Sequence, residues 1–111
     1  MDMRKFTEKS LLAMQTAQAI AREYGNQEIT QAHLLCALVS DEGGLIGQLL
    51  TKMNKSASEI EGAVKAEIEK FPKVQGGEQY LSASLMQALE EAEKQMQKMV
   101  QELRLQLYFM V

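Results

Sequence analysis

The chain has 111 residues, the length of one domain, and 46% of them are hydrophobic and 24% charged, so disorder is not expected. The formal net charge is −3 with acidic and basic residues interspersed, which argues against a nucleic-acid or anionic-membrane surface. The sequence has no run of about 18 apolar residues, no signal-peptide pattern and a single cysteine, so we expect no membrane partner and a cytoplasmic location.

An all-α fold is predicted, because strong helix formers occur throughout the chain and proline occurs once. The first helix is expected over residues 7–24, with Thr7 as its N-cap. Gly25-Asn26 should end it. Its apolar stripe consists of Leu11, Met14, Ala17, Ala21 and Tyr24.

The segment over residues 29–44 predicts the central helix of the fold. Thr30 is a suitable N-cap, and the spacing of Ile29 and Leu34 is that of a hydrophobic staple. Gly43-Gly44 should stop the helix where a left-handed residue is needed. Because its stripe is strongly apolar, we expect the other helices to pack around it; the stripe is Leu34, Leu35, Leu38 and Val39.

Two further helices complete a predicted first repeat over residues 1–71. One covers residues 45–53, and Asn54 can take the left-handed conformation after it. The next begins at Ala57, inside the capping-box pattern from Ser56 to Glu59, and ends near Phe71 because Pro72 follows. Residues 72–81 are predicted to be a linker, with Gly76-Gly77 as its flexible point.

Residues 82–111 begin as a second copy of the start of the chain. Ser82 stands at the position of Thr7, as the next N-cap, and the offset stays constant over the following turns. This indicates an internal repeat that is only partial. The matched pairs are Met86 with Leu11, Ala88 with Ala13, Leu89 with Met14, and Ala92 with Ala17.

The end of the chain predicts one long helix from about Ala83 to Met110, roughly 40 Å at 1.5 Å per residue. No Gly or Pro interrupts it, and Gln106 is the one polar residue in its heptad seam. A single repeat cannot cover such a stripe, so we expect a homodimer through this helix. The alternative is a tail that folds back on its own repeat. The seam consists of Leu85, Leu89, Ala92, Met96, Met99, Leu103 and Met110.

Several short motifs carry a family resemblance. In order they are Phe6-Thr7-Glu8-Lys9-Ser10, the stretch 29–38 with His33-Leu34-Leu35, and Gly43-Gly44. Together they resemble the N-terminal domain of the Clp family of ATP-driven unfoldases. Phe71-Pro72-Lys73-Val74, the glycine-rich linker and Tyr80-Leu81-Ser82 are most similar to its disaggregase members. The resemblance covers residues 3–99 and ends after Met99.

The resemblance implies a fold of Clp-N four-helix repeats packed about a pseudo-twofold axis, here one repeat and a remnant. It implies a non-catalytic module of an ATP-dependent disaggregase, a stress-response chaperone, that recognises unfolded or aggregated polypeptides or an adaptor protein. Thr7 and Leu89 fall on the family's client-binding groove, although N-capping alone would also explain Thr7. The family's acidic pair falls at Gln101 and Leu107, so both acids are missing.

No constellation for catalysis or metal binding is found. His33 and Cys36 share a helix face, but no other His or Cys exists to complete a zinc site, and an apolar setting favours core packing. The resemblance also makes His33 structural. Without a Gly-x-x-x-x-Gly-Lys-Ser/Thr loop, we expect no ATP binding, no cofactor and no enzymatic activity in this chain. Glu90, Glu91 and Glu93 indicate a solvated helix face.

Methionine is frequent, with eight in the chain, and such side chains suit surfaces that accept many partners. For Met96 and Met99 packing in a core or a helix seam is favoured. Two other functional interpretations remain open. In the first, the chain is a truncated or frameshifted fragment that associates with itself without binding clients. In the second, it is a free-standing adaptor or decoy that competes with a full-length unfoldase for clients.

Overall fold

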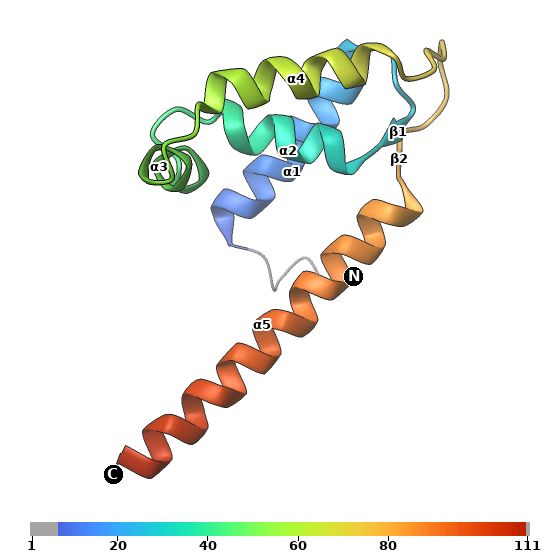
Figure 1. Ribbon diagram of the computed structural model, residues 1–111. Coiled ribbons are helices and arrows are strands. Elements are labelled where there is room, and N and C mark those ends of the chain that lie inside the picture. Colours follow the sequence, from blue (N-terminus) through green and yellow to red (C-terminus); the bar gives the residue numbers. More distant parts are fainter. Residues whose placement is uncertain (1–6, 111) are drawn as a thin grey trace.

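The computed structural model describes residues 7–110, which form an all-α fold with one pair of two-residue strands (Figure 1). Phe6, where the first family motif begins, lies outside the described residues. The predicted helices are all present, with ends within about two residues of those expected. The elements are α1 (Glu8–Glu23), β1 (Glu28–Ile29), α2 (Gln31–Ser40), α3 (Leu45–Lys52), α4 (Ala57–Glu69), β2 (Tyr80–Leu81) and α5 (Ala83–Met110).

Helix α2 is the centre of the helical body, as expected, but the stripe predicted to bury it is wrong in part. Its buried residues are His33, Cys36, Ala37 and Val39, whereas Leu35 is 41% exposed. The helix packs against α1 on one side and α4 on the other, and α3 closes one end (Figure 1). Small residues allow the close approach of α1 and α2, because Ala17 and Ala21 of α1 and Ala37 of α2 are buried together with Ile29 and Leu85. Leu34 packs on this cluster, which includes Ile29.

The ends of the helices follow the expected capping chemistry. Gly25 and Asn54 adopt positive φ angles of 73° and 58° after α1 and α3. The Ser56 hydroxyl accepts a hydrogen bond from the Glu59 amide at the start of α4. One expectation is wrong in part: Gly43 is left-handed, but Gly44 has a φ of −71° and is the N-cap residue of α3.

The predicted linker is tied to the body at several points. Three backbone amides donate to carbonyls of the segment that joins α1 to α2: Val74 to Gly25, Tyr80 to Gln27 and Ser82 to Ile29, at 2.8–3.0 Å. Its last two residues form β2, which runs parallel to β1 with Ile29 opposite Leu81. The linker therefore fixes the point from which α5 starts.

Helix α5 begins like α1, with a side-chain hydroxyl as its N-cap. The Ser82 hydroxyl accepts from the Leu85 amide at 3.0 Å, and the Thr7 hydroxyl accepts from the Ser10 amide at 3.1 Å. Leu85 is fully buried, so the first turn of α5 is part of the core.

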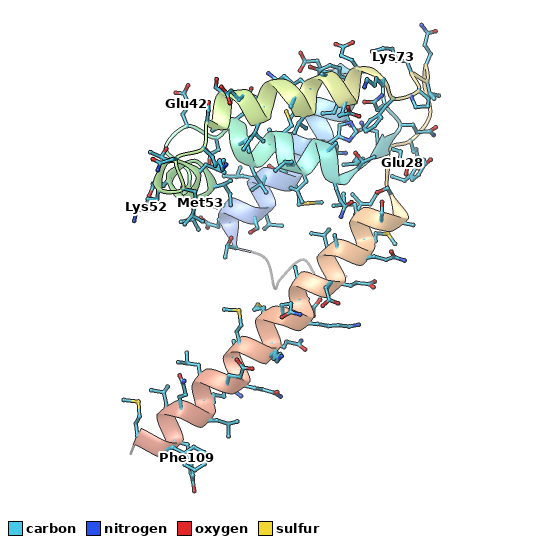
Figure 2. The ribbon with its side chains drawn as sticks, in the orientation of Figure 1. Glu28, Glu42, Lys52, Met53, Lys73 and Phe109 are labelled. Atoms are coloured by element: carbon cyan, nitrogen blue, oxygen red, sulfur yellow. The ribbon has the colours of Figure 1, made fainter. Side chains whose placement is uncertain are left out.

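The rest of α5 projects away from the body, and residues 94–110 are all exposed (Figure 1). Figure 2 shows the Phe109 side chain near the far end, in solvent. The tail therefore does not fold back on its own repeat. No single helix among residues 7–110 is long and apolar enough to cross a membrane. Helices α2 and α3 reach that length and composition only together, and they are bent by 79° relative to each other.

Candidate functional site

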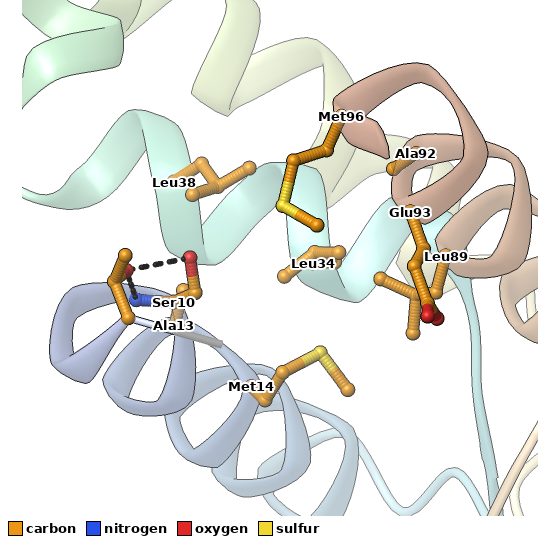
Figure 3. A pocket seen from close by; sticks show the side chains of 10 residues that line it. Ser10, Ala13, Met14, Leu34, Leu38, Leu89, Ala92, Glu93 and Met96 are labelled. Carbon is orange, nitrogen blue, oxygen red and sulfur yellow. Dashed lines mark hydrogen bonds between the residues drawn. The ribbon is translucent and has the colours of Figure 1, made fainter. Parts of the chain in front are cut away.

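An apolar groove lies where the N-terminal half of α1, the exposed side of α2 and the second to fourth turns of α5 meet (Figure 3). Its volume is about 300 Å³. We call this site the α1/α2/α5 groove. Its ten lining residues are Thr7, Ser10, Ala13, Met14, Leu34, Leu38, Leu89, Ala92, Glu93 and Met96.

The structure brings together the two residues that the sequence predicted for client binding. Thr7 comes from the start of α1 and Leu89 from α5, and both line the α1/α2/α5 groove. Leu89 and Leu34 also pack on the buried cluster, so the groove floor is continuous with the core. The floor of the groove is therefore part of the packed interior.

Thr7 has a structural role that the sequence also anticipated. Its hydroxyl accepts from the Ser10 amide and donates to the Ser10 hydroxyl at 3.0 Å (dashed lines in Figure 3). The hydroxyl therefore caps α1. The Thr7 side chain is exposed and also lines the groove.

Two methionines give the groove adaptable walls. Met14 extends into it from α1 and Met96 from α5 (Figure 3). Met96 does not fill the core of the single chain, because the side chain is 42% exposed and lines the groove; packing in a helix seam, the other part of its favoured interpretation, stays a prediction. Flexible thioethers suit a surface that accepts differently shaped apolar groups.

The lining of the groove carries little charge, since Glu93 is the one ionisable residue among the ten that line it. Two neighbouring hollows extend the surface. One of about 640 Å³ shares Thr7 and Leu38 and reaches Leu45 at the start of α3, and one of about 490 Å³ shares Met14 and Leu89 and reaches Tyr80. The face around α1 can thus contact an extended apolar segment longer than the groove itself.

His33 and Cys36 lie in the interior, away from the groove. The His33 Nδ1 accepts from the Thr30 amide at 2.9 Å, and its Nε2 pairs with Asn26 Oδ1 at 3.0 Å. Burial lowers the pKa of His33 and raises the pKa of the Cys36 thiol. No group of three His, Cys, Asp or Glu side chains that could hold a metal occurs within residues 7–110.

The sequence analysis missed what His33 does. It is the third residue after the N-cap Thr30, and its ring returns a hydrogen bond to the Thr30 amide as Glu does in a capping box. The spacing Thr30-x-x-His33 is the signal that could have shown this.

The two positions of the lost acidic pair do not contribute to the groove. Gln101 and Leu107 lie on the exposed part of α5, as does Tyr108, and none of the three is among the groove residues. Of the glutamates in the predicted solvated face, Glu90 and Glu91 are exposed, and Glu91 accepts a hydrogen bond from Gln95.

Comparison with known proteins agrees with this architecture. Residues 5–103 match the family described as the Clp repeat (R) N-terminal domain. The chaperone protein ClpB of Nitratidesulfovibrio vulgaris is 43% identical over 76 residues, which cover 68% of this chain and 9% of that protein. ClpB of Porphyromonas gingivalis is 40% identical over 93 residues, 84% of this chain and 11% of that protein. ClpB of Bacillus cereus is 32% identical over 104 residues, 89% of this chain and 12% of that protein. The chain thus spans about a tenth of the length of these relatives.

Proposed function

Because the chain belongs to the Clp repeat (R) N-terminal domain family, we propose that it is a substrate- or adaptor-recognition module of a ClpB-like, ATP-dependent disaggregase. The single observation that carries this proposal is the open apolar groove that joins Thr7 and Leu89. The module itself is non-enzymatic and cofactor-free in this proposal. Its setting is the cytoplasm, in the response to protein-damaging stress.

Binding in this groove depends on apolar contact. An unfolded or aggregated polypeptide exposes apolar side chains that a folded protein hides, and one or two of them fill a volume of about 300 Å³. The low charge of the lining leaves little electrostatic selection. The groove is open and the client segment must lose conformational freedom, so binding is weak and readily reversed. Such binding suits a receptor that samples many clients.

The test is the binding of a fluorescent, permanently unfolded protein, followed by anisotropy. Leu89→Asp places a charge on the groove floor and should weaken binding at least tenfold, about 1.4 kcal/mol. Leu12→Asp is the matched control, because Leu12 is on α1, is 59% exposed and is absent from the groove lining. Circular dichroism must show unchanged helicity in both variants. Equal affinities of Leu89→Asp and the wild type would refute the groove as the client site.

A second candidate function is self-association without client binding, and the exposed half of α5 favours it. It predicts no saturable binding of the unfolded probe up to about 1 mM, where the binding free energy is about −4 kcal/mol. A free-standing adaptor or decoy would differ from both, because adding the chain to a reconstituted disaggregation reaction would inhibit it.

A further inference from the structure

The far end of α5 carries apolar side chains around its whole circumference. At 100° per residue, Leu103, Leu105 and Tyr108 point in three different directions, and Phe109 is 80% exposed. A helix that is apolar all round belongs in a buried setting. One neighbouring helix can cover only one side of it. The end of α5 therefore requires a partner surface that surrounds it with more than one element.

The heptad seam of α5 is symmetric about the point between Gln97 and Lys98. In an antiparallel pair of such helices, each a-type position faces a d-type position of the other copy. One register satisfies this from Leu89 to Gln106 and sets a small residue opposite a large one at Ala92 and Leu103. The facing pairs in that register are Leu89 with Gln106, Ala92 with Leu103, and Met96 with Met99; Leu85, the position opposite Met110, is buried in the core of its own chain.

The distribution of charge along α5 selects the antiparallel arrangement. Residues 85–96 contain three glutamates and one lysine, a net charge of −2. Residues 97–110 contain Lys98, Arg104 and Glu102, a net charge of +1. Antiparallel pairing sets the acidic half of one helix beside the basic half of the other, whereas parallel pairing would set the two acidic halves side by side.

This register also puts the segment from Met99 to Gln106 of one helix at the groove of the other copy. Leu89, Ala92 and Met96 line the α1/α2/α5 groove, and in the antiparallel pair they face Gln106, Leu103 and Met99 of the second copy. The other groove walls, with Leu34 and Leu38 of α2 and Met14 of α1, would then cover further sides of the entering helix.

We propose that two copies of this chain form an antiparallel α5 pair in which the segment from Met99 to Gln106 of each helix fills the α1/α2/α5 groove of the other. One two-fold interface covers both apolar surfaces that the single chain leaves open, and each groove is completed by the second copy. The pairing stands without the proposed client binding. The functional consequence of the pairing rests on the proposed client binding: the client site is covered in the dimer and free in the monomer.

Cysteine cross-linking tests the register. We would mix an Ala92→Cys chain with a Leu103→Cys chain under mild oxidation, because facing seam positions approach closely enough for a disulfide. The expected product is the mixed dimer, with neither variant cross-linking by itself. The wild type, whose Cys36 is buried, is the control. Cross-linking of either variant with itself, or no cross-linking in the mixture, would overturn the antiparallel register.

The role of the groove needs a separate variant, because α5 could also pair without it. Mass measurement by light scattering should give about twice 12.5 kDa for the wild type. Leu38→Ala, which removes a groove side chain that is not on α5, should raise the dimer dissociation constant at least fivefold. Leu49→Ala on α3 should leave it unchanged. Equal effects of the two variants, or a wild-type monomer at 100 µM protein, contradict the proposal.

The same samples distinguish failure of the dimer from failure of client binding. Leu103→Asp should give a monomer that binds the unfolded probe more tightly than the wild type, because its groove is free. A monomeric wild type that still binds the probe through Leu89 leaves the client receptor standing and removes only the dimer. A Leu103→Asp chain that remains dimeric overturns the proposed contact.

Discussion

The buried ring of His33 pairs through Nε2 with Asn26 Oδ1 at 3.0 Å and so joins α2 to the loop that follows α1. Its other nitrogen accepts from the Thr30 amide, so the ring is neutral and carries its proton on Nε2. The Asn26 amide then donates to the Pro72 carbonyl at 3.1 Å. These contacts join α2 and the loop after α1 to Pro72, which is 46 residues beyond Asn26 in the sequence.

Stability should decrease as the pH falls below about 6.5. Burial lowers the pKa of His33 in the folded protein, so the unfolded chain takes up the proton first. The contribution is fully present above the unfolded pKa and is lost as the pH falls toward the folded pKa, with a slope of at most about 1.4 kcal/mol per pH unit. Urea unfolding between pH 8 and pH 5 measures it. A His33→Gln chain should show a shallower decline, and equal slopes would contradict the prediction.

Asn26→Ala should destabilise the fold by about 2–3 kcal/mol. The substitution leaves the buried His33 Nε2–H without its partner and also removes the hydrogen bond to the carbonyl of Pro72, an exposed residue. Urea unfolding at pH 7.5 measures the loss, and Gln31→Ala at an exposed position of α2 is the control. A change below 0.5 kcal/mol would mean that water replaces the amide at no cost.

Ser82→Ala should cost about 1 kcal/mol through the loss of the N-cap of α5. Ser82 is buried, so solvent does not readily replace its hydroxyl at the Leu85 amide. The comparison is Ser58→Ala in the first turn of α4, where the serine is exposed. Thermal and urea unfolding should separate the two variants, and equal stabilities would show that the cap is dispensable.

Thr7→Asp can separate the two roles of Thr7. Aspartate is as good an N-cap as threonine, so α1 should remain capped and the unfolding free energy should change by less than about 0.5 kcal/mol. The new charge at the groove should still weaken binding of the unfolded probe by about tenfold. Ser56→Asp makes the same kind of exchange at the N-cap of α4, outside the groove. If both variants bind like the wild type, Thr7 acts only as a cap.

Cys36 should resist alkylation in the folded protein. The thiol is buried, and burial raises its pKa, so little thiolate is present at pH 7 and reagents cannot reach it. Iodoacetamide should react at least 100-fold more slowly than in 6 M urea, as followed by mass spectrometry. A native rate close to the unfolded rate would show that α2 opens readily.

The helices could be predicted because local signals agree with the tertiary structure. Thr7, Thr30 and Ser56 are N-caps as expected, and Asn54 has the left-handed conformation that its position required. The pairing of Ile29 with Leu81 could not be predicted, because two-residue strands carry no periodicity. The groove was predictable only through the family resemblance, since the approach of Met96 to Leu38 depends on the direction in which α5 leaves the body.

Because β2 is paired with β1 and directly precedes α5, the start of α5 is the point about which the helix would rotate relative to the body. The arm from Ser82 to Met110 is about 40 Å long at 1.5 Å per residue, so a rotation of about 10° at this point moves its far end by about 7 Å. Strain placed on the Ile29–Ser82 hydrogen bond by that arm would reach β1 and the N-cap Thr30 directly behind it. A load on the exposed helix is thus passed both to that backbone and to the buried cluster that contains Leu85, on which Leu89 also packs.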